Sequence, residues 1–251
     1  MKNNTINIGC SSYATASWQP LFYPEGLPGK QWFDYYCKFF STYELNSTFY
    51  RFPSVKSLQA WYEKSPEGFT FSIKVPKAIT HIKRLAGCKE EIEKFYNVAA
   101  EGLKDKLGCV LFQLPPSFSY STERLEAVIG AVNPIFNNVV EFRHESRWKE
   151  DVIERLSNNN ITFCSVNFPK LPTSVMKTTQ TAYVRMHGNP RLFYSEYTQQ
   201  QIKGLCNEVF SQNFKHIYIY FNNTASTAGI INALQAKKIN DEFEDHEKEN
   251  L

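Results

Sequence analysis

The sequence predicts a single (β/α)8 barrel, a TIM barrel of the α/β class. Short runs rich in Val, Ile, Phe, Tyr and Leu alternate with helical patterns from end to end, and eight such runs can be counted. Strands that are buried on both faces read as nearly continuous apolar runs, which indicates a parallel sheet covered by helices. Eight alternating units close into a barrel, and 251 residues is a usual length for that fold as one domain.

The elements follow in order along the chain. We expect strands at Ile6–Cys10, Tyr43–Ser47, Thr70–Val75, Cys109–Leu114, Val139–Arg143, Thr162–Asn167, Ala182–His187 and Ile217–Asn222. We expect helices at Trp32–Phe40, Val55–Lys64, Lys89–Lys104, Glu123–Val132, Lys149–Ser157, Thr198–Ser211 and Ala225–Lys237. The connection Phe168–Gln180 carries two prolines and no helical pattern, so the sixth helix is expected to be missing or reduced to a single turn.

An open doubly wound sheet is the alternative architecture. Such sheets usually carry a glycine-rich phosphate loop after an early strand. The only candidate here is the segment Gly9-Cys-Ser-Ser, which has no further glycine. The barrel is therefore favoured.

Composition limits the cellular setting. No stretch approaches the ~20 apolar residues that a membrane span needs, and the polar N-terminus shows no signal-peptide pattern. The six cysteines are scattered and form no CxxC pair, which predicts free, mostly buried thiols rather than disulfides or a zinc site. We therefore expect a cytoplasmic protein without membrane contact.

Charge is divided unevenly along the chain. The last eleven residues carry a net charge of −5, so the other 240 carry +8 within a total of +3. We expect residues 1–237 to form the barrel domain and residues 238–251 a charged, frayed tail. The basic body favours anionic ligands.

Polar residues recur at the predicted strand ends. Side chains two apart on a strand share a face. This spacing joins Glu44 with Asn46, Ser72 with Lys74, Glu141 with Arg143, Ser165 with Asn167 and Arg185 with His187, while Ser11, Gln113 and Asn222 end the remaining strands. A ligand-binding mouth explains the recurrence, because TIM barrels carry their sites at this end. The structural alternative is a salt-bridge network in which Lys74, Arg143 and Arg185 neutralise Glu44 and Glu141.

The chemistry of these side chains suggests their roles. As catalytic candidates we name residues able to move protons or act as nucleophiles: Glu44, Glu141, His187 and Lys74. As substrate-binding candidates we name Asn46, Tyr50, Gln113, Arg143, His144, Arg185 and Asn222. The sharpest pair is Arg185 with His187, because a cation and a titratable ring project from one strand. Gly188 follows them and is expected to let a ligand approach the backbone.

Several of these segments resemble the YecE-like family, a family of uncharacterised TIM-barrel proteins. They are Ile8–Tyr13, Tyr43–Arg51, Gly68–Lys74, Leu111–Pro116, Val140–His144, Tyr183–Gly188 and Tyr220–Asn223. The resemblance covers about residues 6–237 and implies the barrel and a shared site, but no established reaction. One position departs from the family pattern, since Asn167 stands where an acidic residue is expected.

Three functions remain open at this point. The first is an enzyme that binds a small phosphorylated or carboxylated substrate, held by Arg143, Arg185 and Lys74. The second is a metal-dependent phosphoesterase or nuclease built on Glu44, Glu141, His144 and His187, although three nearby cations would repel a metal. The third is a non-catalytic ligand-binding protein. The first is favoured, with a small anionic ligand as partner and nucleic acid less favoured, while no cofactor or metal site is evident and the oligomeric state is open.

Overall fold

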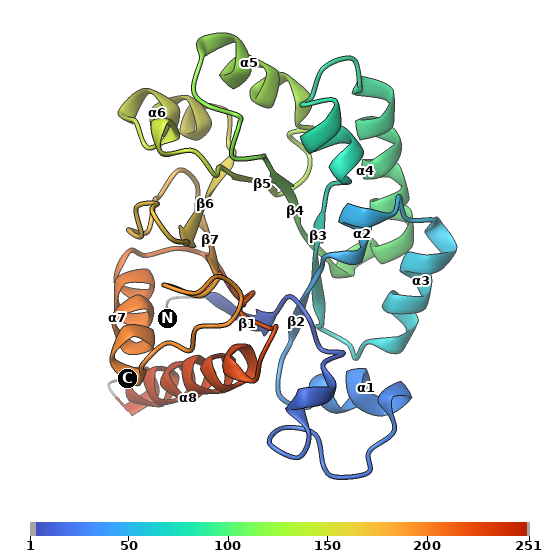
Figure 1. Cartoon of the computed structure of the whole chain (residues 1–251), viewed down its shortest axis with the longest axis vertical. Helices are drawn as coiled ribbons and strands as arrows, with labels where there is room; N and C mark the ends of the chain where they lie inside the picture. Colours follow the sequence, from blue (N-terminus) through green and yellow to red (C-terminus); the bar gives the residue numbers. More distant parts are fainter. Residues whose placement is uncertain (1–3, 250–251) are drawn as a thin grey trace.

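The predicted barrel is confirmed by the computed structural model, which describes residues 4–249, without the side chains of residues 244 and 246–249. Eight parallel strands surround the barrel axis and helices cover their outer side (Figure 1). The strands are β1 (Thr5–Cys10), β2 (Thr42–Leu45), β3 (Thr70–Lys74), β4 (Leu107–Gln113), β5 (Asn138–Glu141), β6 (Thr162–Asn167), β7 (Thr181–Met186) and β8 (His216–Phe221).

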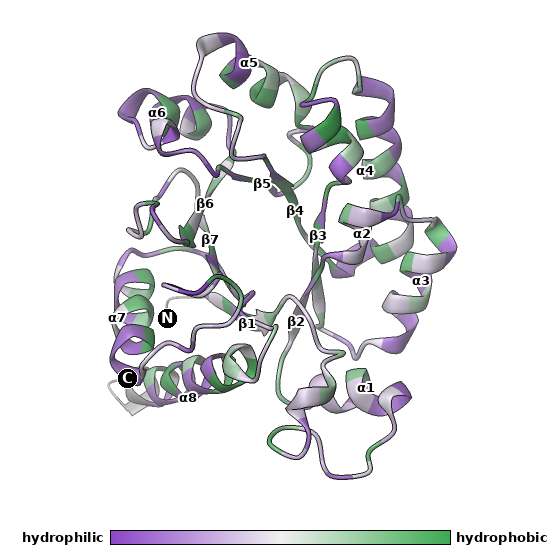
Figure 2. Cartoon of the chain, viewed as in Figure 1, coloured by the Kyte–Doolittle hydropathy of each residue, from purple (hydrophilic) through white to green (hydrophobic). Residues whose placement is uncertain are grey.

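The helices turn an apolar face to the sheet and a polar face outward (Figure 2). They are α1 (Trp32–Tyr36), α2 (Ser47–Tyr50), α3 (Val55–Lys64), α4 (Lys89–Leu103), α5 (Thr122–Ala131), α6 (Glu150–Asn158), α7 (Gln199–Ser211) and α8 (Ala228–Glu249). Side-chain oxygens of Ser54, Ser121 and Thr198 cap α3, α5 and α7, which explains where these helices begin. Among the described residues, no helix is long and apolar enough to cross a membrane.

Two stretches test the details of the sequence prediction. No helix lies between β6 and β7, as the proline-containing segment predicted. Helix α8 instead runs on to Glu249, well beyond the predicted end at Lys237. Ion pairs one turn apart, such as Lys237 with Asp241, and the packing of Phe243 on Phe210 give the acidic segment helical contacts that the charge count did not reveal. All six cysteines are free thiols, as predicted.

Two apolar clusters fill the fold. The larger lies between the sheet and the helices. The smaller faces the barrel interior and consists of Cys109, Leu111, Val139, Cys164, Val166, Tyr183, Tyr218 and Tyr220. Its tyrosines carry hydroxyls toward the polar residues of neighbouring strands, as when Tyr220 contacts Thr42 Oγ1 at 2.5 Å and Ser72 Oγ at 3.0 Å. The barrel interior is therefore filled by side chains.

The barrel is joined differently between β1 and β2. Hydrogen-bonded pairing runs from β2 through β3 to β8 and then to β1. At the seam, the buried hydroxyl of Tyr36 accepts from the Cys10 backbone N–H at 2.8 Å and donates to the Thr42 carbonyl at 3.0 Å. Gly9 permits this approach, because a Cβ there would lie 2.5 Å from the Thr42 carbonyl oxygen. One side chain thus bridges the two strands.

Replacing this hydroxyl should weaken the barrel. We expect Tyr36→Phe to lower the free energy of unfolding by about 1–3 kcal/mol for each buried backbone group left without a partner. Chemical denaturation measures the loss. Tyr50→Phe is the control, because Tyr50 is 79% exposed and should change stability by less than about 0.5 kcal/mol. Equal stability of the two variants would contradict a bridging role for Tyr36.

Candidate functional site

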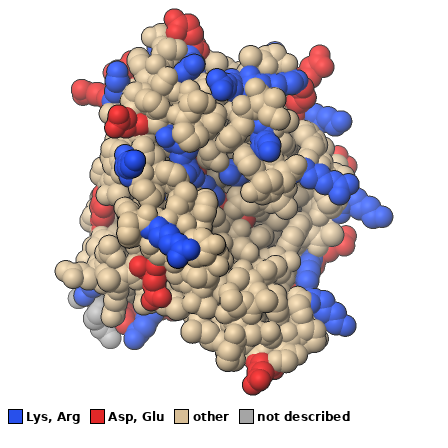
Figure 3. Space-filling model, in the orientation of Figure 1, with Lys and Arg blue, Asp and Glu red and all other residues tan. Residues whose placement is uncertain are grey.

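The carboxyl ends of the strands surround a cavity of about 480 Å³. It is lined by Ser11, Asn46, Phe49, Tyr50, Lys74, Lys77, His81, Gln113, Pro116, Arg143, Arg185, Phe193 and Asn222. The face of the molecule shown in Figure 3 is hollowed at its centre, with Lys and Arg side chains in and around the hollow. Six of the seven strand-end and loop residues predicted to bind substrate line this cavity, and His144 does not.

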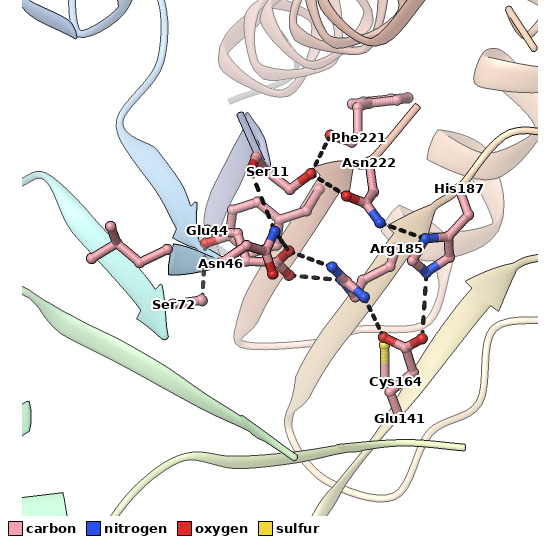
Figure 4. A network of polar contacts seen from close by, with 12 residues as sticks. Ser11, Glu44, Asn46, Ser72, Glu141, Cys164, Arg185, His187, Phe221 and Asn222 are labelled. Carbon is pink, nitrogen blue, oxygen red and sulfur yellow. Dashed lines mark hydrogen bonds and ion pairs between the residues drawn. The ribbon is translucent and has the colours of Figure 1, made fainter. Parts of the chain in front are cut away.

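The floor of the site is a buried ionic network around Arg185 (Figure 4). Arg185 on β7 donates from Nε and Nη2 to the two oxygens of Glu44 on β2, at 2.8 and 2.6 Å. Its third nitrogen, Nη1, donates to Glu141 Oε2 at 2.5 Å. Tyr183 and Asn46 add hydrogen bonds to Glu44 at 2.7 and 3.0 Å. One guanidinium therefore ties together carboxylates from opposite parts of the barrel.

These contacts fix the charge states of the network. Burial alone would raise the pKa of Glu141, but Arg143 and Arg185 outweigh it and hold this pKa well below its ordinary value. Burial likewise opposes the charge of Arg185, and Glu141 and Glu44 reverse that effect and raise its pKa. The network is therefore ionised and internally neutralised.

A second guanidinium extends the network toward the cavity. Arg143 donates from Nε to Glu141 Oε1, and its Nη2 lies 3.0 Å from His187 Nε2. Its plane covers the ring of Phe168 at 4.2 Å. The structure gives Nη1 no hydrogen-bond partner among the described residues, and Arg143 lines the cavity, so this nitrogen is left for a ligand.

His187 is held as a neutral ring behind this wall. It is fully buried: Asn222 Nδ2 lies 2.7 Å from Nδ1, while Nε2 lies 3.0 Å from Arg143 Nη2 and 3.4 Å from Glu141 Oε1. Burial first, and then the Arg143 charge, hold the pKa of His187 well below its ordinary value. His187 does not line the cavity, so its contacts favour a role in positioning Arg143 and Asn222.

Lys74, at the end of β3, stands outside the ionic network. The residue is 8% exposed, and no carboxylate or hydrogen-bond acceptor contacts Nζ within the described part of the chain. Nζ lies over the Phe49 ring, 3.9 Å from the ring centroid. Burial and then the Arg185 charge lower the pKa of Lys74 to about 7, against the attraction of Glu141 and Glu44. The salt bridges considered as the structural alternative therefore form without Lys74, because Arg185 contacts both oxygens of Glu44 and Arg143 pairs with Glu141.

Neutral groups complete the wall beside Lys74. His81 lies in the π-helical turn Ala78–Ile82, packs against Phe49 and contacts Gln113 Nε2 at 3.3 Å. Burial, followed by the charges of Lys74 and Arg143, lowers the pKa of His81 to about 4. His81 is therefore uncharged at neutral pH and adds no positive charge to the cations around it.

Comparison with known proteins places this geometry in a family. The model of DUF72, a family described as "Protein of unknown function", matches residues 7–250. The chain belongs to the DUF72 family. This confirms the resemblance to YecE-like proteins.

Solved structures of DUF72 proteins share the whole barrel. A DUF72 family protein of Thermotoga maritima, TM1631, is 32% identical, with a TM-score of 0.85 over 95% of this chain and 100% of that chain. The Enterococcus faecalis V583 protein EF0366 is 20% identical, with a TM-score of 0.80 over 94% and 95% of the two chains, and shows the fold alone. No curated protein matches the chain.

In this DUF72 protein, two predicted positions lie away from the cavity. His144 accepts from the Ser146 backbone N–H at 3.2 Å and caps the short helical turn Glu145–Arg147. Asn167, at the departure from the family pattern, accepts from the Tyr197 hydroxyl at 3.0 Å. Both positions support loops that follow their strands.

Some residues of the DUF72 cavity were not singled out from the sequence. Lys77 and Phe193 reach it from loops, where no periodicity indicates which side chains turn inward. Gly188 was expected to let a ligand approach, but its φ of +90° and its closeness to the Arg191 carbonyl show that it forms the turn after β7.

The donor set for a metal is incomplete in this geometry. Glu44 and Glu141 already accept from arginines, and His144 lies elsewhere. Within residues 4–249, no group of three or more His, Cys, Asp or Glu side chains is arranged to hold a metal ion. Of the four residues named for the metal-dependent hypothesis, Glu44, Glu141 and His187 meet around Arg185 but are not arranged to hold a metal, and His144 lies elsewhere.

Proposed function

We propose that the mouth of the barrel binds a small phosphorylated or carboxylated substrate and carries out acid–base chemistry on it. The observation that carries this proposal is Lys74, a buried lysine at a cavity whose two carboxylates are already neutralised by arginines. With Arg185 matched to Glu44 and Arg143 to Glu141, the cations Lys74 and Lys77 are in excess. An anion supplies the missing negative charge.

The contacts assign separate tasks to the residues of the site. Arg143 and Lys77 donate to the anionic group of the substrate. The neighbouring amides of Asn46, Gln113 and Asn222 bind the uncharged oxygen atoms of the same substrate. Lys74 is the residue that exchanges a proton, since its pKa of about 7 matches a general acid or base at neutral pH.

The catalytic roles predicted for Glu44, Glu141 and His187 remain predictions. The contacts of these three residues favour positioning over proton transfer. Glu44 and Glu141 hold the two arginines, while His187 lies behind Arg143 without reaching the cavity. A substrate in the cavity meets Lys74 and Arg143 first.

Anion binding at this mouth can be measured directly. We expect inorganic phosphate, and more strongly a matching phosphorylated or carboxylated metabolite, to bind wild-type protein in calorimetric or thermal-shift titrations. Arg143→Gln should weaken binding about tenfold or more, the usual consequence of losing one charged hydrogen bond.

The control is Lys89→Gln, which removes the same charge from the exposed start of α4. Its affinity should equal that of wild-type protein. If both variants weaken binding equally, the effect is one of overall charge, and the proposed anion site is wrong. Near-ultraviolet circular dichroism of Arg143→Gln checks that the barrel remains folded.

A further inference from the structure

Lys74 has an environment that differs from those of its neighbouring lysines. Lys77 lines the same cavity but is exposed, whereas Lys74 is 8% exposed at the end of a central strand. Lys106 is also buried, and it donates to the Tyr62 carbonyl at 2.8 Å and to the Ser65 carbonyl and hydroxyl at 2.7 and 2.9 Å. Among the lysines whose side chains the structure describes, only Lys74 combines burial, an uncommitted amine and access to a cavity.

The short helix α2 holds this amine in place. Thr48 Oγ1 donates to the Lys74 backbone carbonyl at 2.6 Å, which fixes the end of β3 against α2. The next residue, Phe49, covers Nζ with its ring. The Lys74 backbone is therefore fixed by Thr48, and Phe49 covers Nζ on one side, while Lys74 still lines the cavity.

The surrounding charges favour the free amine. Arg185 on β7 and Arg143, two residues beyond the end of β5, face Lys74. Glu44 and Glu141, the carboxylates on that side, are engaged by these arginines. From the other side come neutral His81 and the cation Lys77. A lysine desolvated beside other cations loses its proton readily and becomes a nucleophile at neutral pH.

We propose that Lys74 forms an imine with a small carbonyl compound that carries a carboxylate or phosphate group. This inference rests on the proposed anion site, which would hold the charged group while the carbonyl carbon faces Nζ. The Nζ lone pair attacks the carbonyl carbon, and one proton passes from nitrogen to the carbonyl oxygen to give a neutral carbinolamine. The hydroxyl then takes up a second proton from solvent and leaves as water while the nitrogen lone pair forms the C=N bond, and the remaining proton on nitrogen returns to solvent.

Reductive trapping tests the imine. The full chain is incubated at pH 7 with glyoxylate and sodium cyanoborohydride, whose hydride converts C=N to a stable secondary amine. Peptide mass mapping then compares labelling of Lys74 with that of Lys77 and Lys89 in the same sample. We expect at least tenfold more label on Lys74 than on either exposed lysine. Label distributed according to exposure would overturn the inference.

Two further aldehydes show which chemical group of the substrate the site recognises. Glycolaldehyde phosphate replaces glyoxylate to test phosphate against carboxylate, and acetaldehyde tests a carbonyl without charge. We expect selective labelling by at least one anionic aldehyde and little by acetaldehyde. Equal labelling of Lys74 by all three would overturn the anionic substrate class.

The variant K74R separates this inference from the proposed function. Arginine keeps a positive charge but forms no such imine, so K74R should lose the selective label and still bind phosphate. Wild-type protein that binds phosphate without labelling Lys74 overturns the imine alone. Protein that binds neither phosphate nor the anionic aldehydes overturns both.

Discussion

Arg185→Met is expected to lower the free energy of unfolding by about 3–5 kcal/mol, the usual cost of removing one partner from a buried ion pair. Arg185 is 1% exposed and is shared by Glu44 and Glu141, so its loss leaves two buried carboxylates short of a counter-charge. Methionine fills a similar volume, which makes charge rather than a cavity the main change. Urea denaturation at pH 7 measures the difference.

Two further variants isolate the ionic contribution. Arg191→Met makes the same chemical change on the exposed loop after β7 and should cost less than about 1 kcal/mol. Adding Glu44→Gln to Arg185→Met removes one unpaired charge, so the double variant should be more stable than Arg185→Met alone. If Arg185→Met and Arg191→Met unfold at the same urea concentration, the ionic network does not support the barrel.

The sequence predicted the barrel because its signal is local. Each strand is marked in the sequence by a short apolar run, and eight such runs between helical patterns are compatible with few architectures. The polar strand ends were also predictable, because residues two apart share a face and the ends of parallel strands meet at one mouth. Asn46, Gln113 and Asn222 reach the cavity for this reason.

The sequence did not show which charged side chains pair with one another at the mouth of the barrel. Glu44 and Arg185 are 141 positions apart and meet only because the sheet closes on itself. Composition offers three cations for two carboxylates, and only the closed geometry shows that Lys74 is the one left over. Loop residues follow no strand periodicity. The sequence therefore could not show that Lys77 lines the cavity and that His144 does not.

The unpaired lysine should reduce the stability of the protein. The pKa of Lys74 is lowered to about 7 in the folded chain, below its ordinary value of 10.5, so the unfolded chain binds more protons between these values. Folding is therefore penalised fully below pH 7, and the penalty declines as pH rises toward 10.5. We expect Lys74→Met to raise the free energy of unfolding by roughly 3–5 kcal/mol at pH 6–7 and by less than about 1 kcal/mol at pH 10.

Lys106→Met provides the contrasting control, since it removes a buried lysine whose ammonium is satisfied by two carbonyls and a hydroxyl. That change leaves acceptors unpaired and should destabilise the chain by about 1–3 kcal/mol. Opposite signs for the two substitutions at pH 7, together with a gain for Lys74→Met that fades with rising pH, identify an uncompensated charge. If Lys74→Met destabilises the protein at pH 6, Lys74 is a structural cation and its assignment to the reactive centre fails. A stabilised Lys74→Met protein that also loses its labelling by anionic aldehydes would show that stability is sacrificed at this position for chemistry.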